Sequence, residues 1–192
     1  MKQNFNMKDL ILIGHYLSLG CEGEHSFWTY FEDSVITHSS QLTSQSLIVV
    51  LEALQRRVRR SVSVWTALES ELEPMIPQLS PDELIRVIRI FNAFKKEHTL
   101  WPSFNDAICS YEQLSKEQVY DIMKLCHEDD RKRRVWVHFL EKFLIKKGYF
   151  LQYSYQELKL IESWIKASGK MNSETEATFG LLYKVKNPKI KD

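Results

Sequence analysis

Apolar and polar residues follow one another in the same order at five places along this chain. At each place a bulky apolar residue precedes a Ser, Thr or Asn, and a second apolar residue follows five positions after the first. In LSPDEL (79–84), Ser80 and Glu83 are spaced so that each side chain can accept a hydrogen bond from the other's backbone N–H, which is a capping box. The five stretches are FNMKDL (5–10), LTSQSL (42–47), LSPDEL (79–84), LSKEQV (114–119) and YSYQEL (153–158). They predict five helices that begin alike.

These helix starts recur at a nearly fixed period. Their leading apolar residues are separated by 37, 37, 35 and 39 residues. Further apolar residues lie three and seven positions after the one that closes each start, so they share one face of a helix. A period in this range is the signature of a helical-repeat array.

A tryptophan marks a second predicted helix in the first four units. It is followed by an aromatic residue or Leu three positions on, and by another apolar residue four positions later. We interpret this aromatic position as core between paired helices. The four tryptophans are Trp28, Trp65, Trp101 and Trp136, at spacings of 37, 36 and 35 residues. In the fifth unit Phe179 and Leu182 mark a second helix without tryptophan, as terminal repeats are commonly atypical.

The pattern predicts an all-α fold with about ten helices and no β-sheet. We expect a right-handed α-solenoid of about five antiparallel helix hairpins of 35–39 residues, in a single domain over 1–192. The repeats span about 5–41, 42–78, 79–113, 114–152 and 153–190. No apolar run approaches the roughly 18–20 residues that a membrane-spanning helix needs, so we do not expect one.

The three cysteines, Cys21, Cys109 and Cys126, lack metal-ligand spacing. Cys126 replaces a core aliphatic residue of its repeat, which predicts a buried, reduced thiol and fits a reducing compartment. No signal or transit peptide is visible, because the first repeat begins at Phe5, so either none is needed or the chain is a mature or trimmed one. The sequence by itself leaves the compartment open.

No catalytic motif stands out, so we expect a non-enzymatic protein with no cofactor and no metal. The run HEDD (127–130) resembles a set of metal ligands, but four cations follow it at 131–134. We interpret that run as solvated charge. The stretch GCEG (20–23) has no preceding strand and is interpreted as a turn rather than a phosphate loop.

Positive charge is concentrated where the first helix of each later unit ends. The net charge of +1 and the pI near 7.7 argue against a general polyanion binder. If the repeats stack, these residues form a basic stripe that faces either RNA or solvent. The helix dipole explains one or two cations per repeat but not four. The candidate RNA-binding residues are Arg56, Arg57, Arg59, Arg60, Lys95, Lys96, Arg131, Lys132, Arg133, Arg134, Lys166 and Lys170.

Two polar positions beside the apolar face of each first helix differ between repeats. An invariant core with variable polar positions is how some repeat proteins read one base per unit. The alternative is that these are ordinary exposed helix residues. The candidate base-reading residues are His15, Glu52, Gln55, Arg89, Asn92, Lys124 and His127, and Ser18, Ser163 and Lys166 complete the pairs.

The period and starts such as LSPDELIRVIRIFNAF (79–94) resemble heptatricopeptide and octotricopeptide repeats. They also resemble the leucine-rich helical units of FAST-kinase-like and RAP-domain proteins, over nearly all of residues 5–190. This resemblance implies an organellar, mostly mitochondrial, role in RNA stability, RNA processing or ribosome assembly. No RAP domain is visible after the repeats, so we do not expect the nuclease activity that is suspected of that domain.

Two functions follow from the sequence. In one, the protein binds single-stranded or ribosomal RNA through its basic edge, in the mitochondrial ribosome or in RNA processing. In the other, it is a purely structural accessory subunit, or a scaffold between protein subunits, of a respiratory-chain or ATP synthase complex. The near-neutral charge favours the second function and the aligned cations favour the first. We expect protein partners in both and no small-molecule substrate in either.

Overall fold

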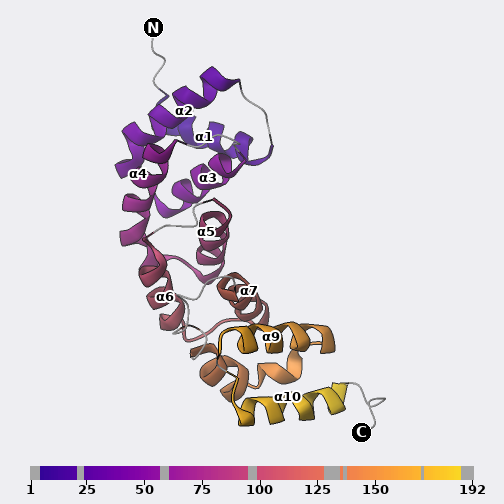
Figure 1. Ribbon diagram of the computed structural model, residues 1–192. Coiled ribbons are helices and arrows are strands. Elements are labelled where there is room, and N and C mark those ends of the chain that lie inside the picture. The colour runs from indigo at the N-terminus through magenta and orange to yellow at the C-terminus, as the bar shows by residue number, and fades with distance from the viewer. Residues whose placement is uncertain are drawn as a thin grey trace. The chain divides into compact units, whose positions relative to one another are not determined.

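The computed structural model describes residues 5–20, 24–56, 61–94, 99–127, 135, 138–169 and 171–186 (Figure 1). Over these residues the chain forms helices and contains no β-strand, which confirms the predicted all-α class for this part of the protein. The chain divides into two compact units, Met1–Phe104 and Asn105–Asp192, and each is described by itself. The right-handed solenoid of five hairpins stays a prediction.

The first unit contains five complete α-helices and the start of a sixth. Within it, α1 packs against α2 and α3, α3 packs against α4 and α5, and α2 packs against α4. The helices are α1 (Met7–Ser18), α2 (His25–His38), α3 (Ser44–Gln55), α4 (Val62–Leu72), α5 (Pro81–Phe94) and α6 (Trp101–Ser110), with short 3-10 turns at Ser39–Gln41 and Glu73–Gln78. The first helices of successive hairpins therefore pack in order along this unit.

The second unit contains α7 (Lys116–His127), α9 (Tyr155–Ala167) and α10 (Ser173–Lys186), with α9 packed against both others. Between α7 and α9 lie a π-helix (Leu140–Lys146) and a 3-10 turn (Tyr149–Gln152). The pattern around Phe139 and Phe143 predicts an ordinary α-helix, so the π-helix is a difference from expectation. Both rings are still buried, with centroids 5.5 Å apart, because four residues span close to one turn in either kind of helix.

All five predicted helix starts contain a capping box. Asn6, Thr43 and Ser154 each exchange hydrogen bonds with the residue three positions on. The backbone N–H of Ser80 donates to Glu83 Oε2 (2.9 Å), and the N–H of Glu83 donates to Ser80 Oγ (3.4 Å). Ser115 and Gln118 make the same two bonds. Because these bonds fix where each first helix begins, equivalent residues of the repeats keep the same register.

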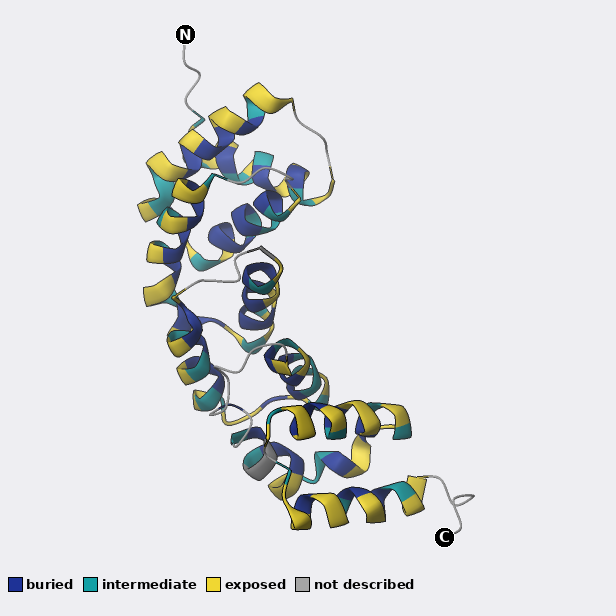
Figure 2. Ribbon diagram, in the orientation of Figure 1, coloured by how far each residue is buried: buried dark blue, intermediate teal, exposed yellow. Residues whose placement is uncertain are grey.

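The predicted core is buried in both units. In Figure 2, buried and exposed stretches alternate along the individual helices, so that a helix has a buried face and an exposed face. The tryptophans Trp28, Trp65 and Trp101 are buried, whereas Trp136 lies outside the described residues. The residues that close the five helix starts, Leu10, Leu47, Leu84, Val119 and Leu158, are fully buried, and so are Val50, Val87, Ile122 and Ile161. Ile13, the first-repeat counterpart of these last four, is partly exposed.

Cys126 is buried and not in a disulfide, as predicted from its place in the core. Cys109 is half-buried, and Cys21 lies outside the described residues. None of the helices that the structure describes is long and apolar enough to cross a membrane.

Candidate RNA-binding surface

The candidate base-reading residues lie on the first helix of each hairpin. His15 and Ser18 are on α1, Glu52 and Gln55 on α3, Arg89 and Asn92 on α5, Lys124 and His127 on α7, and Ser163 and Lys166 on α9. His15, Arg89, Lys124, His127, Ser163 and Lys166 are exposed and the other four are half-buried. In the first unit α1, α3 and α5 pack in succession, so three of these pairs lie on neighbouring helices.

Glu52 forms an ion pair with a residue of the next repeat. Its Oε1 accepts hydrogen bonds from Nε (2.9 Å) and Nη2 (2.5 Å) of Arg86 on α5. The two residues are 34 positions apart, close to one repeat period. Because this carboxylate holds a neighbouring helix, Glu52 contributes to packing between repeats and is a poor candidate for reading a base.

Lys166 forms an ion pair within its own hairpin. Its Nζ lies 2.8 Å from Glu162 Oε1, and the hydroxyl of Tyr183 on α10 donates to Glu162 Oε2 at 2.5 Å. Burial raises the pKa of Glu162, but the hydrogen bonds from Lys166 and Tyr183 outweigh it, and the net pKa lies below the ordinary value. The hydrogen bond to Glu162 in turn raises the pKa of Lys166. The positive charge of Lys166 is thus partly balanced inside the protein.

His127 covers an aromatic residue of the following repeat. Its ring centroid lies 5.8 Å from that of Trp164 on α9, and Tyr120 on α7 lies 5.2 Å from the same indole. Trp164 is buried under these two rings. His127, like Glu52, therefore contacts the next repeat, although the ring itself is exposed.

Most of the basic stripe lies outside the described residues: Arg57, Arg59, Arg60, Lys95, Lys96, Arg131, Lys132, Arg133, Arg134 and Lys170. Arg56 is described and caps the C-terminus of α3. Its Nη1 lies 3.3 Å from the point that a β-carbon on Gly20 would occupy. Since Gly20 directly follows α1, this guanidinium lies over the end of the preceding first helix. The ends of α1 and α3 are therefore neighbours, although the first repeat has Glu22 and Glu24 there in place of cations.

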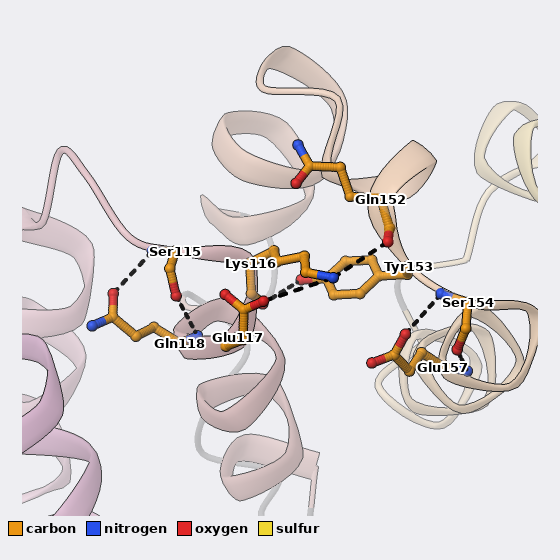
Figure 3. Close-up of polar contacts among 8 residues, drawn as sticks. All are labelled: Ser115, Lys116, Glu117, Gln118, Gln152, Tyr153, Ser154 and Glu157. Atoms are coloured by element: carbon orange, nitrogen blue, oxygen red, sulfur yellow. Dashed lines mark hydrogen bonds and ion pairs between the residues drawn. The ribbon is translucent and has the colours of Figure 1, made fainter.

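A cleft of about 290 Å³ opens between the N-terminal ends of α7 and α9 (Figure 3). The Tyr153 hydroxyl donates to the carbonyl oxygen of Lys116 (2.7 Å) and joins the two helix starts. Lys116 Nζ donates to the carbonyl oxygen of Gln152 (3.4 Å) and lies 3.7 Å from Glu117 Oε1. The cleft is lined by Lys116, Glu117, Tyr120, Asp121, Tyr153 and Glu157.

Three ionisable groups of this cleft keep their ordinary charge states at neutral pH. Backbone N–H groups, and then the Ser115 and Ser154 hydroxyls, lower the pKa of Glu117 and of Glu157 respectively by hydrogen bonding. Burial raises the pKa of the Tyr153 phenol. None of these three groups is therefore poised to exchange a proton near pH 7, which a general acid or base requires. Within the described part of the chain, no cluster of His, Cys, Asp and Glu is arranged to hold a metal ion.

Polar residues at the junctions between repeats were not identified by the apolar pattern. In the second unit, Tyr149 Oη donates to the carbonyl of Leu114 (2.6 Å) and Lys147 Nζ to that of Glu112 (2.9 Å). Lys186 Nζ likewise donates to the carbonyl of Leu151 (2.7 Å). Donor and acceptor are 35 residues apart in each case. A search of the sequence for polar side chains one repeat period after the end of a preceding repeat could have identified these donors.

Comparisons with protein-family models, with curated proteins and with solved structures found no match. The evidence for repeats is therefore internal to this chain. It consists of the sequence period, the five capping boxes and the contacts between residues about one period apart.

Proposed function

We propose that this chain is a non-enzymatic helical-repeat protein of a larger assembly, and that single-stranded RNA lies along the edge where its first helices end. The observation that carries the proposal is Arg56, whose guanidinium lies over the end of the preceding first helix beside Gly20. In the sequence, cations follow the first helices of the later repeats at the equivalent place. The solenoid of five hairpins is part of this proposal, and its mitochondrial setting comes from the family resemblance.

On this edge the cations would contact phosphates, and the polar positions of the first helices would contact bases. We assign base contacts first to Arg89 and Asn92, because both belong to the central repeat and their side chains can donate to base edges. Glu52 and His127 are engaged with the following repeat. Because these two positions contribute to packing between repeats, the protein should bind RNA with modest sequence preference and strong dependence on salt.

Filter binding over a salt series tests this function. With roughly four to six phosphate contacts, the log–log slope for single-stranded RNA should be about −3 to −4. Replacing Arg56, Arg57, Arg133 and Arg134 with Gln should flatten the slope. A matched control replaces four exposed lysines away from this edge with Gln, namely Lys8, Lys146, Lys159 and Lys184, and should keep the wild-type slope. Absence of measurable affinity at low salt would refute the RNA function.

Sequence preference is tested with a second variant. Replacing Arg89 and Asn92 with Ala should change the preferred RNA sequence and leave the salt slope nearly unaltered, because base contacts release few counterions. Selection of bound sequences from a random pool, for wild type and variant, measures this difference. Identical selected pools would show that these two residues do not read bases.

A scaffold between protein subunits is the second candidate. It is favoured by the net charge of only +1 and by the engagement of Glu52 and Lys166 with groups of the chain itself. This function predicts negligible RNA binding by the isolated protein. It also predicts that the variant with four arginines replaced by Gln still enters its native assembly, which co-purification from the source cells measures.

A further inference from the structure

We infer that one side of the first hairpin is a docking surface for an α-helical segment of a partner protein. Three apolar residues of α1 and its C-terminal cap, at helical spacing, are exposed there: Leu12 (56%), Tyr16 (55%) and Leu19 (66%). Tyr30 on α2 adds a fourth exposed side chain (46%). We call these four residues the first-hairpin face.

In the first unit, the register of the repeats shows what packs against this side of a first helix. In α3 the position of Leu12 is taken by Val49, whose Cγ1 lies 3.3 Å from the point that a β-carbon on Gly14 of α1 would occupy. In α5 the same position is Arg86, which bonds to Glu52 on α3. In both cases the residue contacts the first helix of the preceding hairpin.

The position of Tyr16 is also buried in later first helices, and here the exposed fraction differs more between the repeats. Its counterparts on α3 and α5, Ala53 and Ile90, are 0% and 3% exposed. In the second unit the counterpart is Trp164 on α9, which is packed against Tyr120 of α7. The position of Tyr16 is thus buried in α3, α5 and α9.

The second helix of the first hairpin also exposes a residue whose counterpart in a later hairpin contacts the preceding hairpin. Ser103, two positions after Trp101 on α6, donates to Glu73 of the preceding hairpin at 3.3 Å. Tyr30 stands two positions after Trp28 on α2 and is exposed instead. Both helices of the first hairpin therefore expose the side that continues the interface already formed between successive hairpins.

The chemistry of the partner follows from the residues that this interface uses elsewhere. The preceding first helix presents a small or aliphatic residue at the position of Gly14, whose counterparts are Leu51, Ile88 and Met123. A second copy stacked end to end would present Glu162 of α9, which is bound to Lys166 and Tyr183. Burying that ion pair would be costly. The expected partner is therefore a different protein, with a helix that presents uncharged aliphatic side chains.

This surface consists of other residues than the proposed RNA edge, so either proposal can fail while the other stands. A direct test fuses a copy of residues 42–78 ahead of Phe5 in the full chain, so that Leu51 of the copy can meet Leu12. Amide exchange in α1 should slow by about tenfold or more if the added hairpin docks, because local opening is then coupled to undocking. The matched control carries Leu51→Glu in the copy only and should leave α1 exchange at the rate of the unfused chain. Unchanged exchange in the first fusion would overturn the inference.

The identity of the partner is tested in the source cells with a photo-crosslinking amino acid at position 16 of the full chain. The expected adduct joins it to a helical segment of another protein, and the same probe at position 181 on α10, also exposed, should not give it. Leu12→Glu should abolish the adduct. Adducts only to a second copy of the chain or to RNA would overturn the inference. The inference would also be overturned if light scattering showed that the wild-type chain is a dimer and that Tyr16→Glu is a monomer.

Discussion

The carboxylate of Glu69 on α4 holds Thr99, which lies just ahead of α6 in the next hairpin. Glu69 Oε1 accepts hydrogen bonds from the backbone N–H (2.7 Å) and from the hydroxyl (2.9 Å) of Thr99, 30 residues away. Glu69 is buried, so these bonds form where water competes little. An acidic residue of one hairpin thereby positions the start of a helix in the following one.

Loss of this carboxylate should destabilise the first unit. Glu69→Ala should lower the free energy of unfolding by roughly 1.5–3 kcal/mol, the range for hydrogen bonds that involve a charged group. Urea unfolding followed by circular dichroism measures the change. Asp33 on α2 of the same unit is exposed, and Asp33→Ala should alter stability by no more than about 0.5 kcal/mol. Equal effects of the two substitutions would contradict the role given to Glu69.

The tryptophan position is core in the described hairpins. Trp101 is buried and meets Phe104 edge to face, with ring centroids 5.6 Å apart. Trp101→Ala should therefore cost roughly 3–5 kcal/mol, as large-to-small core changes do. Leu181 on α10 is mostly exposed, and Leu181→Ala is the matched control with little expected effect. A melting temperature for Trp101→Ala equal to that of the control would show that the tryptophan does not support the core.

The cap of α5 makes stability depend on pH. Hydrogen bonds from the backbone N–H and then from the hydroxyl of Ser80 lower the pKa of Glu83 below its ordinary value of 4.5. Because the folded-state pKa is depressed, this group adds stability above the ordinary pKa and loses it as the pH falls through the lowered one.

Ser80→Ala should raise the pKa of Glu83 towards the ordinary value, because the hydroxyl hydrogen bond is gone. NMR titration of the carboxyl carbons from about pH 6 to about pH 2 measures this shift and covers the window in which the linkage acts. Glu157 forms the same capping box with Ser154 in another hairpin and should keep its lowered pKa in this variant. A Glu83 pKa that does not move in Ser80→Ala would rule out the hydroxyl as a cause.

Two glycines inside helices should differ in how they tolerate an added side chain. A β-carbon at Gly180 on α10 would meet nothing within 4 Å, whereas one at Gly14 on α1 would lie 3.3 Å from Val49 Cγ1. Gly180→Ala should raise the free energy of unfolding by about 0.5–1 kcal/mol through helix propensity. Gly14→Ala should gain less, and Gly14→Leu should cost roughly 1–3 kcal/mol by overpacking α1 against α3. Thermal unfolding of the three variants checks the order, and a stable Gly14→Leu protein would contradict the close approach of these helices.

The sequence was a sufficient guide to the helix starts and to the apolar core. Both depend on residues a few positions apart, so a local pattern carries the information. Ser115 and Gln118, for example, are three residues apart and form the predicted pair of hydrogen bonds. The buried face from Val119 to Cys126 follows from the helical period alone.

Contacts between hairpins were harder to predict, because they depend on how one helix is placed against another. Glu52 varies between repeats as a base-reading residue would, yet it pairs with Arg86 in the next repeat. From the sequence, a reading position and a position that joins two repeats look the same. The π-helix at Leu140–Lys146 is a similar case, since its apolar spacing also suits an α-helix.

The hydrogen bonds that join successive junctions in the second unit limit which rearrangements of the gene can persist. Lys147 donates to the carbonyl of Glu112, and Lys186, one repeat later, donates in the same way to the carbonyl of Leu151. At the first of these junctions, Tyr149 and Tyr153 add hydrogen bonds to the carbonyls of Leu114 and Lys116. Duplication or deletion of one hairpin by unequal recombination would keep the apolar register and the lysine bond, but it would bring to this junction a repeat that starts with Leu or Phe in place of Tyr153. These hairpins are alike in period without being interchangeable, so the order of hairpins in this unit should be under selection as well as their sequence.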